Sequence, residues 1–284
     1  MVKPFLTSEM LGVISKMPAA QRRQAMTVVA QEEWSRCAED IFYWIDPARH
    51  PLTYVYTKDN HPMHVCQICQ DGATYHFSQR QVHLLSRHKI SAGTDAEQKV
   101  YFHELDTIRP FTMMPYFEEI IQAWLREPLL CIEKSRDMMA TWLIVVCYTW
   151  DALFHKGRQH IFQSETAMKT HELCERVMVL ANNQPRWLRE VAPASFSEGS
   201  SRAGYVKIPK MQSEIIGFPQ GADKVRQFHP TGFFSDEAAF NPEAGDCFAA
   251  IKPAIQNGGR YTAVSSANPS FFQHLCRDTV QEVL

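Results

Sequence analysis

The stretch Thr231-Gly-Phe-Phe-Ser-Asp-Glu-Ala-Ala-Phe240 contains an apolar run that ends in two adjacent acids, Asp236 and Glu237. A buried strand with two carboxylates at its carboxyl end can direct one acid to a Mg²⁺ ion and the other to a water. The same pair also fits a strand that runs into a solvated turn. Other segments of the sequence are needed to distinguish these two interpretations.

Composition limits the class of protein. The chain has 284 residues, of which 45% are hydrophobic and 21% charged, as in globular proteins with one large domain or two smaller ones. It has neither an apolar run of about eighteen residues nor a signal-peptide pattern, so we expect no membrane partner and a cytoplasmic location. The net charge of -2 gives no global attraction to nucleic acid, so any DNA contact needs a local basic patch or several subunits.

One pair among the eight cysteines has the spacing of a metal site. Two residues separate Cys66 from Cys69, thirteen separate Cys69 from His83, and four separate His83 from His88. This spacing predicts a knuckle with two thiolates and a helix with two imidazoles around a structural Zn²⁺. The alternative is a reduced cysteine pair in a histidine-rich loop, and further histidines nearby leave the choice of ligands open: His61, His64 and His76.

A second segment has the layout of a phosphate-binding loop. The run Leu129-Leu-Cys-Ile132 predicts a buried strand, Glu133 to Thr141 a tight loop, and Trp142 to Phe154 an apolar helix. A standard loop of this kind has glycines and ends in Lys followed by Ser or Thr. Here Ala140 takes the place of the lysine, so on spacing alone the segment also fits a simple connection between strand and helix.

Strands and helices alternate along the rest of the chain. Strands are predicted over 159–163, 214–219, 231–235 and 261–264, with helices over 166–181 and 246–255, and a loose region over 182–201. This order favours an α/β fold of P-loop NTPase type, with an open, mainly parallel sheet flanked by helices. The N-terminal part predicts a helical, zinc-finger-like extension, and we expect a division into residues 1–104 and 105–284.

Taken together, three ordered segments resemble the ATPase domain of the large terminase subunit, the DNA-packaging motor of tailed bacteriophages. They are Ser213 to Arg226, Phe233 to Phe240, and Ser265-Ser-Ala-Asn-Pro-Ser-Phe-Phe272. The resemblance covers about residues 105 to 275. It implies binding of ATP and Mg²⁺, with Asp236 as the Walker B acid that faces the metal and Glu237 as the glutamate that orients the attacking water.

The resemblance also assigns the loop. Terminases often carry a deviant Walker A loop whose basic residue lies at its start, and Lys134-Ser135-Arg136 with Thr141 is similar to such a loop. Thr141 would then bind Mg²⁺ through its hydroxyl. Either Lys134 or Arg136 would reach the phosphates.

Further positions follow from the same resemblance. Ser265, Ser266 and Asn268 match the motif that couples hydrolysis to movement. Tyr116 resembles the adenine-contacting segment, although Phe117 stands where that segment usually has Gln. Candidates for a charge-stabilising arginine, in cis or from a neighbouring subunit, are Arg202 and Arg226.

The implied function is ATP-driven translocation of double-stranded DNA into a procapsid. The implied partners are DNA, a portal protein and a small terminase subunit, with a homo-oligomeric ring as the active form, a monomer in isolation, and an infected bacterial cell as the location. The chain ends at Leu284, before a nuclease domain of the terminase type would fit, so we expect no cleavage from it, whether it is a fragment or a complete protein.

Two other functions remain open. A degenerate P-loop module would bind nucleotide weakly and serve as a scaffold for assembly. A helicase-like translocase would share the acidic strand, but it needs a second motor domain.

Overall fold

The structure is a computed structural model that places the chain in two compact units, Met1–Leu52 with Thr112–Leu284, and Thr53–Phe111. The N-terminal helices therefore belong with the large sheet, and the boundary expected at 104/105 lies inside the second unit. The residues that the structure describes are 8–46, 53–55, 64–69, 74–75, 80–91, 93–104, 108–111, 113–136, 138–199, 202–219, 221 and 225–277.

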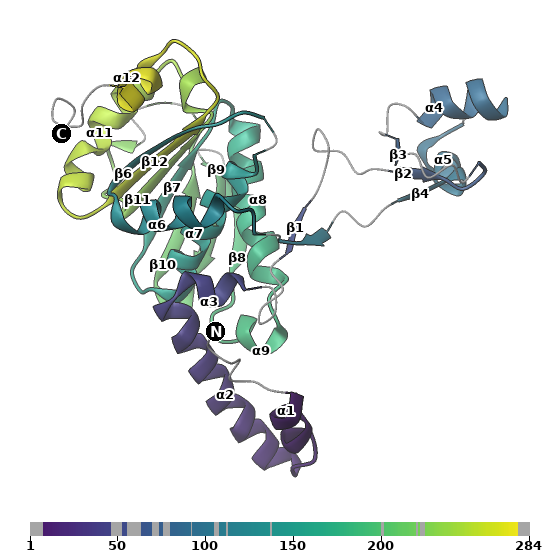
Figure 1. The fold of residues 1–284 in the computed structure, drawn as a ribbon, viewed down its shortest axis with the longest axis horizontal. Coiled ribbons are helices and arrows are strands. Elements are labelled where there is room, and N and C mark those ends of the chain that lie inside the picture. Colours follow the sequence, from purple (N-terminus) through teal and green to yellow (C-terminus); the bar gives the residue numbers. More distant parts are fainter. Residues whose placement is uncertain are drawn as a thin grey trace. The chain divides into compact units, whose positions relative to one another are not determined.

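The first unit is built on a seven-stranded sheet (Figure 1). In spatial order its strands are β6 (Leu129–Glu133), β12 (Arg260–Ser265), β11 (Gly232–Asp236), β7 (Gln159–Gln163), β10 (Ser213–Gly217), β9 (Arg202–Ile208) and β8 (Ser195–Gly199). The strands from β6 to β10 are parallel, whereas β9 and β8 are antiparallel. The predicted open, mainly parallel sheet is therefore confirmed.

The order of the strands brings distant segments to one edge. The last strand in sequence, β12, lies between β6 and β11, with Ser265 opposite Glu133 and Val264 opposite Asp236. The carboxyl ends of these parallel strands meet at one edge of the sheet. Such an edge is where open α/β sheets bind their ligands.

Helices cover both faces of the sheet. On one face lie α7 (Ala140–Phe154) and α8 (Ala167–Asn182), and Tyr148 of α7 contacts the rings of Phe162 and Phe234. Nearly every residue of α7 is buried, as expected for a helix that is apolar all round. The other face is covered by α11 (Ala244–Gln256) and α12 (Phe271–Arg277).

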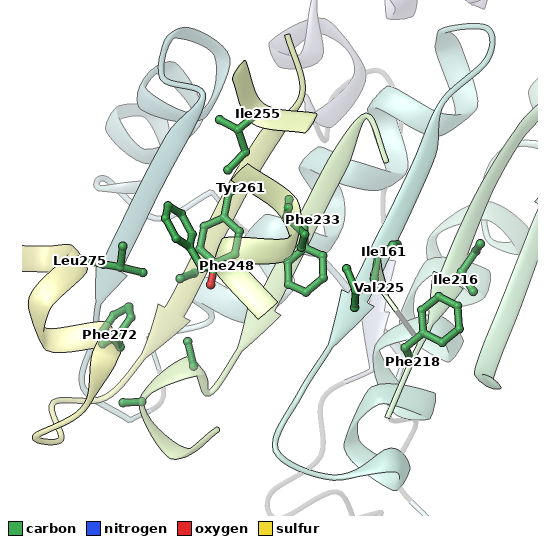
Figure 2. Packing of buried hydrophobic residues seen from close by; sticks show 14 residues of the cluster. Ile161, Ile216, Phe218, Val225, Phe233, Phe248, Ile255, Tyr261, Phe272 and Leu275 are labelled. Atoms are coloured by element: carbon green, nitrogen blue, oxygen red, sulfur yellow. The ribbon is translucent and has the colours of Figure 1, made fainter. Parts of the chain in front are cut away.

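The core under α11 and α12 is mainly aliphatic and aromatic. Figure 2 shows Phe233 and Tyr261 on adjacent strands, with Phe248 of α11 against them. The Phe233 and Tyr261 rings stack with centroids 5.5 Å apart, and the Phe248 ring meets Tyr261 edge-on. This packing fixes β11 against β12 immediately below the acid pair.

The N-terminal helices α1 (Ser8–Ser15), α2 (Ala19–Glu39) and α3 (Ile41–Ile45) belong to the same unit. Of these, α2 packs on α7: the Trp34 and Phe154 ring centroids lie 4.5 Å apart, and Trp150 Nε1 donates to the Cys37 carbonyl at 2.6 Å. The unit also contains α6 (Phe117–Arg126), α9 (Arg186–Arg189) and short 3₁₀ turns at Pro209–Met211 and Ala238–Phe240. Among the described helices, none has the length and apolarity of a membrane span.

The region predicted to be loose contains regular structure, and this is a correction. The helix α9 and the strand β8 lie within 182–201, and β8 pairs with β9 in an antiparallel hairpin. The sequence of β8 has one apolar residue, Phe196, so local pattern does not identify it. Pairing with β9, in which Val206 and Ile208 are buried, supplies its stability.

The second unit is small. The strands β1 (Thr53–Val55) and β5 (Ile108–Pro110) form an antiparallel pair, and β2 (His64–Cys66), β3 (Thr74–Tyr75) and β4 (Phe102–Glu104) form a three-stranded sheet. Its helices are α4 (Arg80–His83), a π-helical turn (Leu84–His88) and α5 (Asp95–Tyr101). Cys66, Leu84 and Phe102 form its core.

Candidate active site and candidate metal centre

The acid strand and the loop helix meet through one hydrogen bond. Thr141, in the first turn of α7, donates its hydroxyl to Oδ1 of Asp236 at 2.8 Å. Asp236 ends the fully buried strand β11. A hydroxyl and a carboxylate, both hard oxygen donors, are therefore adjacent at the carboxyl edge of the sheet.

Asp236 is a buried carboxyl group. Burial raises the pKa of Asp236 to about 6, and the hydrogen bond from Thr141 and the charge of Arg176 oppose this increase. The neighbouring charge of Glu237 adds to it. A bound cation would offset the cost of ionising this group.

Glu237 is held in an unusual backbone conformation. Its φ is +51°, in the left-handed region that non-glycine residues rarely adopt. Lys134 Nζ donates to Glu237 Oε1 at 3.0 Å, and the Ser265 hydroxyl lies 3.5 Å from Glu237 Oε2. The side chains of Lys134 and Glu237 are 13% and 24% exposed. Thus Glu237 is fixed between the loop and the end of β12.

The loop before α7 contains a residue, Met139, in the left-handed backbone conformation that glycine usually adopts. Counting back from Thr141, Met139 occupies the place of the second glycine in the standard phosphate-loop pattern, and its φ is +51°. Such strain in a non-glycine residue costs about 1–3 kcal/mol and concentrates at functional sites. The Tyr116 hydroxyl donates to the Met138 carbonyl at 2.9 Å, which ties the predicted adenine-contacting segment to this loop.

The two basic residues of the loop differ. Lys134 follows β6 directly, and its backbone N–H donates to the Ser265 carbonyl at 2.9 Å, so the start of the loop is anchored to β12. Ser135 and Arg136 are exposed, and the Ser135 hydroxyl is 3.5 Å from the Arg136 carbonyl. In this structure Lys134 neutralises Glu237, whereas Arg136 extends to solvent.

The end of β12 contacts the segment after the acids. The buried Ser265 hydroxyl accepts a hydrogen bond from the Ala239 N–H at 3.1 Å, and Asn268 Nδ2 donates to the Ala239 carbonyl at 3.1 Å. Ser266 is half-buried beside them. Movement of the backbone at Glu237 would therefore move residues 265–268. Movement of residues 265–268 would in turn move the backbone at Glu237.

The two candidate arginines lie elsewhere. Arg202 begins β9, opposite Gly199 of β8. Because Gly204 of β9 lies opposite Gly217 at the end of β10, the start of β9 is at the same edge of the sheet as Asp236. Two strands, β7 and β10, separate β9 from β11. Arg226 is exposed on the connection between β10 and β11.

Three polar residues beside the acids were missed by sequence reasoning. The guanidinium of Arg176 in α8 lies 5.0 Å from the ring centroid of Trp142. The pKa of Lys169, also in α8, is raised by its hydrogen bond to Glu165 and further by the charges of Glu237 and Asp236. Ser164 follows β7 and is buried. The rule that ligand sites lie at strand ends, applied to β7, would have found Ser164. The two cations belong to a helix face that sequence spacing does not relate to β11.

These residues fit a magnesium nucleotide. The hydroxyl of Thr141 and the carboxylate of Asp236 are the ligand types that Mg²⁺ takes, and the N-terminus of α7 offers backbone N–H groups to phosphate. Glu237 lies one residue beyond, with its carboxylate hydrogen-bonded to Lys134. When bound, the magnesium ion would supply charge neutralisation to the phosphates.

The second unit brings together the four predicted zinc ligands, Cys66, Cys69, His83 and His88, whose ligand atoms all lie within 4.8 Å of one another. Cys66 Sγ and His88 Nε2 are 3.6 Å apart, Cys69 Sγ and His83 Nε2 3.5 Å, and the two Nε2 atoms 3.2 Å. Tetrahedral zinc with ordinary bond lengths requires about 3.6 Å between sulfur and nitrogen and about 3.4 Å between nitrogens. The donor set and its dimensions thus fit zinc.

A π-helical turn solves a spacing problem in this centre. His83 and His88 are separated by five positions. In an α-helix side chains four apart share a face, so five would rotate the second imidazole away. The wider turn Leu84–His88 returns it to the side of His83, and Lys89, with φ +54°, ends the helix. Of the other histidines considered, His61 and His76 lie outside the described residues.

The fold is similar to solved phage terminase structures. The ATPase domain of the Thermus phage P74-26 large terminase matches with a TM-score of 0.42 and 15% identity, over 58% of this chain and 68% of that one. The large terminase of a thermophilic bacteriophage, solved in complex with ADP, matches with a TM-score of 0.41 and 11% identity, over 54% of this chain and 39% of that one. The HK97 bacteriophage large terminase matches with a TM-score of 0.44 and 14% identity, over 55% of this chain and 34% of that one.

At these identities the likeness concerns the fold alone, and the chain spans well under half of the ADP-bound terminase and of the HK97 terminase. No protein-family model and no curated protein matches the sequence.

Proposed function

We propose that the first unit is an ATP-hydrolysing motor domain of the terminase large-subunit type. The observation that carries the proposal is the hydrogen bond between Thr141 and Asp236, because it joins the helix after the deviant loop to the acid strand that the sequence resemblance singles out. The proposed role of the motor is to drive double-stranded DNA into a viral procapsid.

Each residue has a separate task in this proposal. Thr141 and Asp236 hold the metal ion, and the first turn of α7 receives phosphate oxygens. Glu237 accepts a hydrogen bond from the attacking water once Lys134 turns from its carboxylate to the phosphates. The proposal therefore assigns Lys134 as the loop cation, in a switch from its 3.0 Å contact with Glu237.

The coupling step rests on the contacts of β12. Ser265 bonds both to the Ala239 N–H and, at 3.5 Å, to Glu237, and Asn268 bonds to Ala239. A change in the Glu237 side chain during hydrolysis would alter these bonds and so move the segment from Ser265 to Asn268. We assign Ser266 to the same segment.

Partners and assembly belong to the same proposal. The active form is a homo-oligomeric ring with double-stranded DNA, a portal protein and a small terminase subunit in an infected bacterial cell. Arg202, at the carboxyl edge but two strands away from β11, suits an action in trans, and Arg226 is the alternative. In the second unit, zinc would stabilise the fold, since four protein ligands leave no open position for chemistry.

The test is Mg²⁺-dependent ATP turnover of the full chain, with and without double-stranded DNA, for the wild type and for Glu237→Gln. Turnover that the substitution abolishes, with nucleotide binding retained, supports the proposal. A wild type without turnover, even when assembled with DNA, portal and small subunit, would contradict it.

One observation favours a second candidate function, a degenerate P-loop module that serves as a scaffold. The loop has Ala140 in place of lysine, and Lys134, one of its two basic residues, is bound to Glu237. If Lys134 never leaves Glu237, the module would bind nucleotide weakly without hydrolysing it. Weak binding of a fluorescent ATP analogue, unchanged by Lys134→Ala, would support this function.

A further inference from the structure

The hydroxyl of Ser164 is buried without a hydrogen-bond partner. The residue is 1% exposed, and among the described residues nothing bonds to its Oγ atom. Its backbone is fixed, because its N–H donates to the Thr170 hydroxyl at 3.0 Å. Leaving a buried hydroxyl unpaired is unfavourable, because the group loses its hydrogen bonds to water. Such a group in a folded protein calls for a partner such as a water or an ion.

The register of the sheet places Ser164 beside Asp236. β7 and β11 are parallel neighbours in which Gln163 lies opposite Ser235, so the next residue on each strand is Ser164 and Asp236. Neighbouring strands lie about 4.8 Å apart. The unpaired hydroxyl is therefore at the strand end adjoining the candidate metal ligand.

Both residues lie near the helices on one face of the sheet. Phe162 and Phe234 contact each other and Tyr148 of α7, so both face α7. Side chains two residues apart on a strand share a face, so Asp236, two residues after Phe234 in β11, also faces α7, where Thr141 meets it. Ser164 is the first residue after β7, and its hydrogen bond to Thr170 holds it against α8 on the same face.

Asp236 has a carboxylate oxygen that is available to a cation. Thr141 occupies Oδ1 of Asp236, and no hydrogen bond to its Oδ2 comes from the described residues. The guanidinium of Arg176 lies over the Trp142 ring, 5.0 Å from its centroid, and its charge acts on Asp236. Magnesium keeps several of its waters in protein sites, and each bound water donates two hydrogen bonds. A hydroxyl next to the metal-binding carboxylate is suited to accept one of them.

We propose that Ser164 is a positioning residue that accepts a hydrogen bond from a water ligand of the metal ion held by Asp236 and Thr141. This proposal rests on the proposed nucleotide site, and it adds β7 to the elements that build that site. It also accounts for a hydroxyl that is otherwise buried at a cost.

The test is binding of Mn²⁺, as a spectroscopic substitute for Mg²⁺, to the full chain with a non-hydrolysable ATP analogue, followed by electron paramagnetic resonance. We expect Ser164→Ala to weaken Mn²⁺ binding about fivefold, the effect of one hydrogen bond of about 1 kcal/mol. Ser164→Thr keeps a hydroxyl and should restore most of the affinity. Binding of the analogue without metal should stay unchanged.

The matched control is Thr149→Val. Thr149 also has a buried hydroxyl without a partner among the described residues, but it lies in α7 two turns beyond Thr141. It should leave Mn²⁺ affinity unchanged. Equal affinities in the wild type and Ser164→Ala, or equal losses in Ser164→Ala and Thr149→Val, would overturn the proposal for Ser164 alone. A wild type that binds no Mn²⁺ with the analogue would overturn the proposed function as well.

Discussion

The candidate zinc centre and the acid edge are built in opposite ways. In the second unit the four ligands Cys66, Cys69, His83 and His88 come from one short stretch, and local spacing brings their atoms together. At the acid edge Thr141 meets Asp236 across 95 positions and Lys134 meets Glu237 across 103. The first centre depends on turn and helix geometry, whereas the second depends on the order of strands in the sheet.

Because of this difference, substitutions in the two regions should affect the fold differently. A small unit whose core contains Cys66, Leu84 and Phe102 has little apolar surface to stabilise it, so we expect its fold to depend on the proposed metal. The acid edge lies on a large sheet with helices on both faces, so its side chains can change without loss of the fold. The following predictions separate these two behaviours, beginning with the largest effect.

Loss of one thiolate should unfold the second unit alone. In Cys66→Ser we expect zinc to fall from one per chain to near zero, because the four ligands act together and structural zinc contributes roughly 10 kcal/mol or more to such folds. Metal analysis and limited proteolysis measure the effect. The control is Cys276→Ala, a half-buried cysteine of the first unit. Full zinc content in Cys66→Ser would refute the centre.

Loss of the Glu237 carboxylate should remove turnover and leave the fold intact. Glu237→Gln keeps the shape of the side chain but weakens its interaction with a water, and we expect a loss of about 10²- to 10⁴-fold in ATP turnover. Thermal unfolding should change little, since the glutamine has nearly the same shape and its amide oxygen can still accept the hydrogen bond from Lys134. Turnover within threefold of the wild type would show that Glu237 does not assist the reaction.

The buried Asp236 should make the metal-free protein less stable as pH rises. Its folded pKa of about 6 exceeds the unfolded value of about 3.9, so the folded state binds the proton more tightly. Stability should therefore decrease between about pH 4 and pH 6 and stay lower above. Asp236→Asn should remove this decrease and gain up to about 3 kcal/mol at pH 7.

Urea unfolding at pH 4.5 and pH 7 in the presence of chelator measures this effect. Asp246→Asn, an exposed position on α11, is the control and should follow the wild type. An Asp236→Asn variant that is less stable than the wild type at pH 7 would contradict the conclusion that burial of the ionised Asp236 destabilises the fold.

Shortening the turn between the two histidines should have the smallest effect. Deletion of the exposed Ser86 would place His83 and His88 four positions apart, so both imidazoles would share one face of an α-helix without the π-turn. We expect zinc content to remain at one per chain, with affinity within about tenfold of the wild type. Complete loss of zinc would mean that the π-turn has a further role.

The sequence predicted the parts of the fold that local pattern determines. Strand β7 was placed at 159–163 as found, β11 and β12 within one residue at each end, and the zinc ligands by their spacing. The hairpin of β8 and β9 was missed because β8 has little apolar pattern of its own and depends on its partner. The predicted division at 104/105 differs because Trp34 and Trp150 attach the N-terminal helices to α7.

At the acid edge the sequence indicated the residues but not their partners. The adjacency of Thr141 and Asp236 agrees with the roles proposed for them. The pairing of Lys134 with Glu237, the left-handed Met139, and the approach of Arg176 and Ser164 all follow from tertiary packing. No spacing rule relates α8 to the acids at the end of β11, whereas the strand-end rule would have indicated Ser164.

The most direct test of the central claim is a crystal structure of the full chain with Mn²⁺ and a non-hydrolysable ATP analogue, with the metal located by anomalous scattering. The account predicts a Mn²⁺ peak between the side chains of Thr141 and Asp236, about 2.1 Å from the ligand oxygens, with the phosphates at the N-terminus of α7 and Lys134 turned toward them. A nucleotide bound away from α7, or a metal peak remote from Asp236, would contradict it.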